Sequence, residues 1–134
     1  MTVANLAKAP MISIVDDDKA VREATKGLVR SLGYSAATFA SAEEYLHSDR
    51  VEDTLCLITD VQMPGMNGVE LQERLIADGH GTKVIFMTGF SEEGVRARVL
   101  KAGAIGFLKK PFDDACLVKC LDRALGGKSS QTPE

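Results

Sequence analysis

The stretch Leu55-Cys56-Leu57-Ile58-Thr59-Asp60 is an apolar run of strand length that ends in a carboxylate. Three other runs have the same form and end in acidic, hydroxyl or basic side chains: 11–15 before Asp16-Asp17-Asp18, 84–87 before Thr88-Gly89, and 105–109 before Lys110-Pro111. In a parallel α/β sheet all strands share one carboxyl edge, where ligands bind. We therefore expect these side chains to converge in space although they are far apart in the sequence.

Segments of helical period alternate with the strand-length runs, which predicts βα units and a parallel sheet. The expected strands are 11–16, 34–39, 55–60, 83–88 and 105–109. The expected helices are 19–32, a short helix opened by Ser41-Ala42-Glu43-Glu44, Asn67 to Ala77 or Asp78, Ser91 to Gly103, and Asp113 to Gly126-Gly127. Five such units favour a single-domain α/β fold with strand order 2-1-3-4-5 and helices on both faces, which is the flavodoxin-like arrangement.

Local signals mark the helix ends and the core faces. Asp18 and Asn67 are good N-caps, and the segment from Ser41 to Glu44 has the form of a capping box. Apolar residues at helical spacing predict the faces turned toward the core. In the first helix these are Val21, Ala24, Leu28 and Leu32, and in the last they are Leu117, Cys120, Leu121, Ala124 and Leu125.

The composition is that of one ordinary folded domain. The chain has 134 residues, of which 45% are hydrophobic and 26% charged, so a packed core is expected and disorder is not. The net charge of -3 gives no electrostatic case for nucleic-acid binding, and no apolar run approaches the ~20 residues of a membrane span. We expect 1–10 to be a flexible lead-in rather than a secretory signal, 11–126 to be the domain, and 127–134 to be a flexible tail.

The three cysteines argue against a disulfide framework, because their number is odd and nothing indicates an extracellular context. Cys56 lies in an expected strand and is interpreted as a core residue. Cys116 and Cys120 are four positions apart on an expected helix and would share a face. They could form half of a metal site, but the sequence has no second pair to complete it.

Asp16, Asp17 and Asp60 are expected at the ends of adjacent strands, next to the switch point of the sheet. Two unit charges about 4 Å apart interact by roughly 4 kcal/mol at an effective dielectric near 20, so these carboxylates repel one another unless a positive charge lies among them. A hard divalent cation such as magnesium is the natural partner for oxygen ligands and would draw a phosphate toward the negative cleft. Asp18 lies where an N-cap belongs and is interpreted as one.

Asp60 stands alone at the end of its apolar strand. An isolated carboxylate can be a turn residue, or a nucleophile that attacks phosphorus to give an aspartyl phosphate. Such a transfer needs positioning and charge neutralisation, for which Lys110 offers an ammonium and Thr88 a hydroxyl. Each is a weak signal alone, but at four strand ends together they favour a phosphoryl-acceptor site. The Lys110–Pro111 bond is one that can adopt the cis form.

With these residues the chain resembles the receiver domain of bacterial two-component response regulators. The matching strings are IVDDD at 14–18, LITDVQMPGMNGVEL at 57–71, VIFMTG at 84–89 and KAGAIGFLKKPF at 101–112. They occur in the family's order and spacing, and with SAEEYL at 41–46 the pattern is most similar to the FixJ type of receiver, which has a CheY-like fold. The stretch 89–94 departs from FixJ-like sequences, which leaves the surface of the fourth helix and the choice of partner open.

The resemblance implies a set of metal ligands and an acceptor. Asp60 would be the phosphoacceptor and would receive the group from a sensor histidine kinase or a histidine phosphotransfer protein. Asp17 and Asp60 would bind Mg²⁺ (or Mn²⁺) directly, Asp16 would bind it through water, and the backbone carbonyl of Gln62 would complete the protein ligands.

It also implies a switch. Lys110 and Thr88 would hold the phosphoryl oxygens, and Phe107 would be the aromatic residue that turns inward as Thr88 moves. The added charge would repack the face made by helix four, strand five and helix five. A homodimer through that face is a further hypothesis, since three apolar residues on it are expected to be partly exposed: Leu100, Ile105 and Leu117.

The implied protein is a cytoplasmic signalling module and not a conventional enzyme, because it would catalyse only its own phosphorylation and dephosphorylation. It would pass the signal to a downstream output protein or domain, with no nucleic acid or membrane bound by this chain itself. One alternative is that the chain is the receiver half of a FixJ-like DNA-binding transcription regulator. Another is a receiver that binds partners without phosphorylation, which the filled acidic and donor positions disfavour.

A rival from another class is a phosphohydrolase of the haloacid dehalogenase type. Asp16-Asp17-Asp18 can be interpreted as its D-x-D nucleophile motif, with Thr88, a lysine and the pair Asp113-Asp114 as later parts. This interpretation leaves Asp60 without a role and places the late acidic pair where it should cap a helix.

Overall fold

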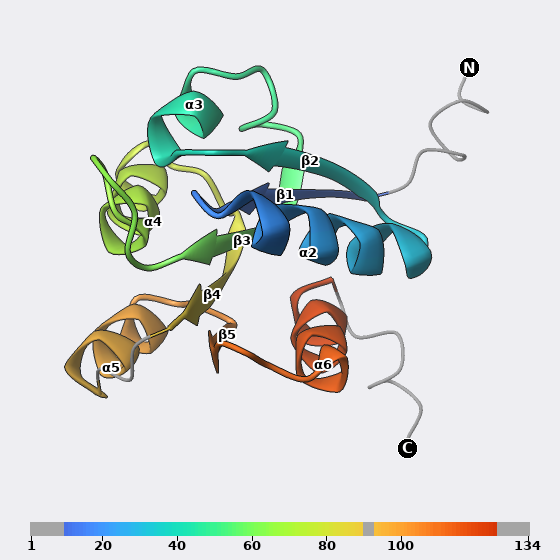
Figure 1. Ribbon diagram of the computed structural model, residues 1–134. Coiled ribbons are helices and arrows are strands. Elements are labelled where there is room, and N and C mark those ends of the chain that lie inside the picture. Colours follow the sequence, from blue (N-terminus) through green and yellow to red (C-terminus); the bar gives the residue numbers. More distant parts are fainter. Residues whose placement is uncertain (1–9, 90–92, 126–134) are drawn as a thin grey trace.

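The computed structural model describes residues 10–89 and 93–125, and within them one parallel sheet forms the centre of the molecule (Figure 1). Its strands run in the order β2-β1-β3-β4-β5, and every neighbouring pair is parallel. The strands are β1 (Met11–Val15), β2 (Ser35–Phe39), β3 (Thr54–Asp60), β4 (Lys83–Thr88) and β5 (Gly106–Lys109). The predicted fold class and strand order are confirmed, and each strand end lies within one residue of its expected position.

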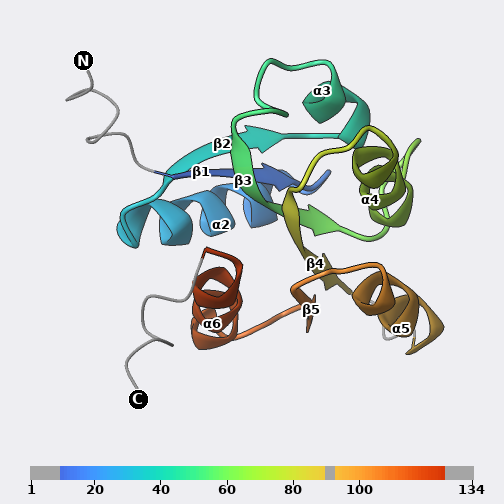
Figure 2. The ribbon, with the colours of Figure 1, turned by 180° about the vertical axis from the view of Figure 1, so that it is seen from behind.

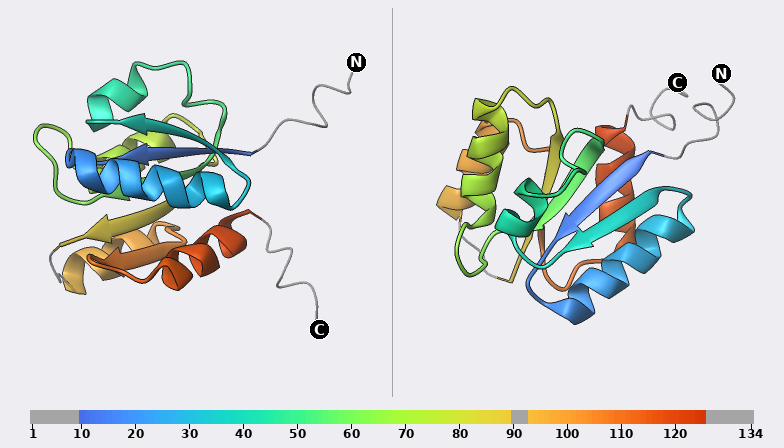
Figure 3. Two further views of the ribbon diagram at one scale, coloured as in Figure 1. Left: turned by 45° about the vertical axis from the view of Figure 1, so that its right-hand side comes forward. Right: turned by 90° about the horizontal axis from the view of Figure 1, so that it is seen from above.

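Helices cover both faces of this sheet, as Figure 2 shows from behind. They are α2 (Lys19–Ser31), α3 (Ala42–Leu46), α4 (Gly68–Ala77), α5 (Glu93–Lys101) and α6 (Asp114–Ala124). Seen from above in Figure 3, α2 and α6 lie on one side of the sheet, and α4 and α5 lie on the other. In the described ranges no helix combines the length and the apolar character needed to cross a bilayer.

Several predicted features lie outside the described residues. They are the start of a helix at Ser91, the stop at Gly126-Gly127, the tail over 127–134, and the lead-in over 1–10 except for Pro10.

The predicted caps are mostly present. The Asp18 carboxylate accepts a hydrogen bond from Ala20 N (2.9 Å), and Asn67 forms a complete capping box with Glu70. Ser41 Oγ accepts from Glu44 N (3.0 Å), but the Glu44 carboxylate returns to the amide of Ala40 rather than to that of Ser41, so this box is only half formed.

The prediction for Asp113 needs a correction. It occupies the N-cap position of α6, but its side chain makes no capping hydrogen bond. The residue is exposed, and its backbone carbonyl accepts from Cys116 N at 3.0 Å. Water can therefore serve both the free carboxylate and the first amides of this helix, which removes the need for a side-chain cap.

The buried faces of the helices agree with the predicted stripes only in part. In α6, Leu117, Cys120, Leu121 and Ala124 are all buried, as expected. In α2, Thr25 and Val29 form the buried line, whereas Ala24 is exposed and Leu32 is 39% exposed. The spacing of apolar residues on α2 placed the core face slightly off its true position, because Leu32 lies beyond the last helical turn as the C-cap.

Burial also corrects the dimer hypothesis. The dimer hypothesis took Leu117 as partly exposed, although this residue also belongs to the expected core stripe of α6, and its side chain is wholly buried. Leu100 and Ile105 are partly exposed, as expected. The apolar surface open to a second copy on this face is therefore smaller than the sequence indicated.

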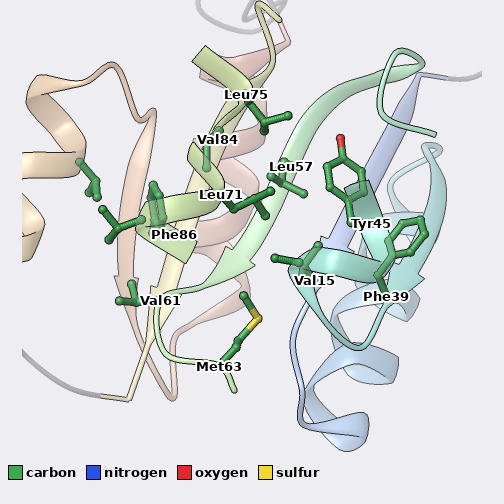
Figure 4. Packing of buried hydrophobic residues seen from close by; sticks show 13 residues of the cluster. Val15, Phe39, Tyr45, Leu57, Val61, Met63, Leu71, Leu75, Val84 and Phe86 are labelled. Atoms are coloured by element: carbon green, nitrogen blue, oxygen red, sulfur yellow. The ribbon is translucent and has the colours of Figure 1, made fainter. Parts of the chain in front are cut away.

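Two separate apolar clusters form the core, one on each face of the sheet. The cluster shown in Figure 4 joins β-strand residues such as Leu57 and Phe86 to Tyr45 of α3 and Leu71 of α4. The other joins the opposite face of the strands to α2 and α6. Since successive side chains of a strand point to opposite faces, each strand contributes to both clusters, which explains why the central strands are apolar throughout.

The three cysteines are free thiols with different surroundings. Cys56 is wholly buried, as predicted, and burial together with the neighbouring Cys120 raises the pKa of its thiol to about 12. Cys120 is buried and Cys116, four positions earlier on α6, is exposed. Among the described residues, no group of potential metal ligands includes a cysteine.

These surroundings predict selective thiol chemistry. In the native protein near neutral pH, Cys116 should react with a thiol reagent at least about a hundredfold faster than Cys56, because Cys56 reacts only after local or global unfolding. Timed labelling followed by peptide mass spectrometry measures both rates. A Cys116→Ser variant should lose the fast phase, and equal rates at Cys56 and Cys116 would contradict the packing described.

Candidate functional site

The residues singled out in the sequence come together at the carboxyl edge of the sheet. Asp16 follows β1, Asp60 is the last residue of β3, and Lys110 follows β5. The strands run in one direction (Figure 3), so their ends open on the same side of the molecule. The spatial convergence predicted from the four strand ends is therefore present for these three side chains.

Lys110 connects two of the acidic residues directly. Its Nζ donates to Asp16 Oδ2 at 2.9 Å and to Asp60 Oδ2 at 3.0 Å. The partners are 94 and 50 positions away in the chain. The Lys110–Pro111 peptide bond is cis, as the sequence allowed.

The second oxygen of each carboxylate is occupied by the backbone. Asp16 Oδ1 accepts from Asp18 N at 2.9 Å, and Asp60 Oδ1 accepts from Gln62 N at 3.3 Å. Each aspartate thus bonds the amide two residues further on, a local turn typical of this side chain. Both carboxylates are held in the same way, with one oxygen on the following loop and the other on Lys110.

Asp17 completes an acidic group with these two residues. One carboxylate oxygen from each of Asp16, Asp17 and Asp60 lies within 4.8 Å of the others. Asp16 and Asp60 are buried, whereas Asp17 is exposed, so the group opens to solvent on one side. Oxygen ligands at this spacing suit a hard divalent cation such as magnesium.

The electrostatics of the site leave an excess of negative charge. Burial raises the pKa of Asp16, although hydrogen bonds from the Asp18 amide and from Lys110 act in the opposite direction. Burial alone would lower the pKa of Lys110, but its hydrogen bonds to Asp16 and Asp60 outweigh that effect and raise it. One ammonium therefore faces three carboxylates, and a further cation would relieve the remaining repulsion.

The loop after β3 and the start of α4 pack closely against the backbone of Asp60. Gly68 N donates to the carbonyl of Val61 at 2.8 Å and closes the loop at the start of α4. A Cβ at Gly68 would collide with the carbonyl oxygen of Asp60, so only glycine fits there. Gln62 lies in the loop next to Asp60 and is exposed.

Thr88 and Phe107 lie on the two strands beyond Asp60. Thr88 ends β4 and is almost wholly buried, and its carbonyl accepts from Lys110 N at 2.7 Å. Phe107 is half-buried in β5, with its ring centroid 6.4 Å from that of Phe86. The polar end of β4 is thus tied through the backbone to the residue that bridges the carboxylates.

Two contacts near the site were not predicted. Arg22 Nη1 donates to the backbone carbonyl of Asp16 at 2.9 Å, and Met66 N donates to Glu43 Oε2 at 2.8 Å. Arg22 lies within a helix among other charged residues, and Glu43 is 23 positions away from Met66. Neither contact leaves a periodicity or a local motif in the sequence from which it could have been found.

Comparison with known proteins agrees with this geometry. A family model described as "Response regulator receiver domain" matches residues 12–122. The chain is 38% identical over 120 residues to the transcriptional regulatory protein FixJ of Azorhizobium caulinodans, covering 90% of this chain and 57% of that protein. It is 39% identical over 118 residues to the response regulator protein TodT of Pseudomonas putida, covering 88% of this chain and 52% of that one.

A solved structure supports the same assignment. The response regulator StyR matches with a TM-score of 0.82 and 39% identity, covering 92% of this chain and 62% of that chain. The chain thus spans about half the length of the curated relatives it matches. With the fold, the strand-end residues and these matches in agreement, the chain belongs to the response regulator receiver domain family and is of the FixJ and TodT type.

Proposed function

We propose that Asp60 accepts a phosphoryl group from a sensor histidine kinase or a histidine phosphotransfer protein, and that the chain signals through the resulting change. The observation that carries this proposal is the placement of Asp60 at the sheet edge, bonded to Lys110 and beside Asp16 and Asp17. A nucleophilic carboxylate next to an ammonium and an acidic cation site is suited to phosphoryl transfer.

In the proposed step, a carboxylate oxygen of Asp60 attacks phosphorus and forms an acyl phosphate. The bond from phosphorus to the donor imidazole breaks, and the imidazole leaves with its electron pair. Lys110 is already within hydrogen-bond distance of the Asp60 carboxylate and can follow the charge onto a phosphoryl oxygen. Thr88, at the end of the neighbouring strand, would offer its hydroxyl to another.

The residues fit a divalent cation. Asp17 and Asp60 would hold Mg²⁺ or Mn²⁺ directly, Asp16 through water, and Gln62 through its backbone carbonyl. Such an ion would neutralise part of the negative charge of the incoming phosphoryl group. The fit rests on the three carboxylate oxygens within 4.8 Å of one another and on the raised pKa of the buried Asp16.

The proposed response lies in the face formed by α5, β5 and α6. Phosphorylation adds charge and acceptor oxygens beside Thr88, which would move toward them and open space for Phe107 to turn inward. Phe107 is suited to this because it is half-buried beside Phe86 rather than locked in the core. Such a device needs two arrangements that differ by only a few kcal/mol.

The chain spans about half the length of its curated relatives, FixJ and TodT. We propose that residues 11–126 act as the receiver for a downstream output protein or domain, as in a FixJ-like transcription regulator, with a homodimer as a further form. The proposed setting is the cytoplasm, where free thiols such as Cys116 stay reduced. In this role the chain catalyses only its own phosphorylation and dephosphorylation.

The haloacid dehalogenase interpretation is not favoured by any observation. Asp113 and Asp114, which would be the late acidic motif of such a hydrolase, are exposed at the start of α6 and are not part of the acidic group. Asp60, which has no role in that interpretation, is part of it.

Asp60→Asn tests the acceptor. With acetyl phosphate and Mg²⁺, the rate of labelling should fall by about a hundredfold or more, because the nucleophile is lost. Intact-protein mass spectrometry measures the phosphorylated fraction over time. Asp49→Asn is the matched control, since the Asp49 side chain is 98% exposed and should be labelled like the wild type. Unchanged labelling of the Asp60 variant would refute the proposed acceptor.

Asp16→Asn tests the charge balance of the site. Without divalent cations near neutral pH, the variant should unfold at a temperature roughly 3–5 °C higher, because a charged carboxylate with a raised pKa is less stable in the folded protein than in the unfolded chain. Differential scanning calorimetry measures the shift.

The raised pKa of Asp16 also predicts how the stability difference between the wild type and Asp16→Asn depends on pH. The buried charge of Asp16 destabilises the folded wild type at a pH above the raised pKa of this carboxyl. As the pH falls through the folded-state pKa, the Asp16 carboxylate is protonated and this destabilisation is removed. The advantage of the variant should therefore shrink on acidification. Added Mg²⁺ should stabilise the wild type more than the variant. A variant that is less stable at neutral pH without cations would contradict the charge balance described.

A further inference from the structure

Glu43 connects α3 to the loop that follows Asp60. It lies in the first turn of α3, and its Oε2 accepts a hydrogen bond from Met66 N at 2.8 Å. This bond from the Met66 amide holds the pKa of the Glu43 carboxyl below its usual value. The contact spans 23 positions and joins α3 to a loop whose Met63 side chain lies in the same core cluster as Tyr45 of α3.

Gly65 provides a second, independent observation. Its φ is +75°, in the left-handed region that favours glycine, and a Cβ there would lie only 2.7 Å from Glu43 Oε2. The backbone of the loop therefore comes close to the carboxylate, and a side chain at this position would displace the Glu43 carboxylate. Both the amide of Met66 and the bare Cα of Gly65 are arranged around the same oxygen.

The loop over residues 61–67 is held at three places. At its base, Gly68 N donates to Val61 O at 2.8 Å. In its middle, the buried Met63 side chain packs into the core cluster of Figure 4. At its tip, Glu43 holds Met66. The partly buried Met66 side chain also packs against this cluster, so Glu43 adds the hydrogen bond that fixes the Met66 backbone amide.

Gln62 lies within this held segment, between the base and Met63. Its amide donates to Asp60 Oδ1 at 3.3 Å, the longer of the two carboxylate–amide bonds of the site. A small rotation of the segment would therefore alter both the orientation of the Asp60 carboxylate and the direction of the Gln62 carbonyl. Metal affinity depends on such supporting contacts, because they hold the ligands in place.

We propose that Glu43 is a positioning residue for the metal site, acting through the loop to orient the Gln62 carbonyl and the Asp60 carboxylate. The inference rests on the proposed function, in which those two groups bind Mg²⁺. Glu43 itself touches neither the metal nor the phosphoryl group, so its effect is on the affinity of the site rather than on the chemical step.

Glu44 supplies a matched control. It is the next residue of the same helix, carries the same charge and is exposed like Glu43. Its carboxylate accepts from Ala40 N at 2.8 Å and so supports the start of α3 without reaching the loop. Glu44→Ala should therefore weaken the helix, whereas Glu43→Ala should release the loop.

The experiment compares the full chain with Glu43→Ala, Glu43→Gln and Glu44→Ala. Mg²⁺ is titrated while backbone amide NMR shifts are followed, and the Mg²⁺ dependence of labelling by acetyl phosphate is measured in parallel. Half-saturation should need about three- to tenfold more Mg²⁺ in Glu43→Ala than in the wild type. Glu43→Gln keeps an acceptor oxygen and should stay near the wild type, and Glu44→Ala should not change the requirement.

The outcomes separate the two proposals. If the wild type shows no saturable Mg²⁺ response, the proposed function and this inference both fail. If the wild type responds but Glu43→Ala has the same half-saturation, only the role of Glu43 is overturned. An equal loss of affinity in Glu44→Ala also overturns it, because the effect would then come from α3 stability, which thermal unfolding of each variant measures separately. At saturating Mg²⁺, Glu43→Ala should be labelled at nearly the wild-type rate, and a large residual loss would contradict a purely positioning role.

Discussion

The pair of hydrogen bonds made by Lys110 is the contact on which the site depends. Its Nζ lies 2.9 Å from Asp16 Oδ2 and 3.0 Å from Asp60 Oδ2, so one ammonium joins the ends of three strands. Without it, two buried carboxylates within 4.8 Å of each other would be strongly destabilised by desolvation and mutual repulsion. The parallel order of the sheet makes this contact geometrically available, since it brings every strand end to the same edge.

Most of the fold could be predicted because strands and helices differ in the period of their apolar residues. The central strands are buried on both faces and are nearly continuous apolar runs, which set their limits to within a residue. The details that failed depend on tertiary packing. The exposure of Ala24 and the missing side-chain cap at Asp113 are decided by what covers each helix in the folded protein, and spacing along the chain does not record that.

The residues of the candidate site also divide into those that the sequence pattern could predict and those that depend on tertiary packing. Asp16, Asp60 and Lys110 could be located because strand ends in a parallel sheet must meet, whatever the intervening sequence. Arg22 and Glu43 could not, since each acts on a backbone group through a long side chain whose target is set by the path of a loop. Backbone donors and acceptors are identical in every residue, so the sequence carries no mark of which one a side chain will reach.

The 94 positions that separate Asp16 from Lys110 have a consequence for the order of events in the cell. β5 is the last strand of the sheet in the sequence, and Lys110, which follows it, can reach the two carboxylates only after β5 has paired with β4. Pairing across such long separations is entropically unfavourable until the intervening chain has condensed. A nascent or partly melted chain therefore lacks the assembled acidic site, so a ligand of that site would bind only to chains that have completed the sheet.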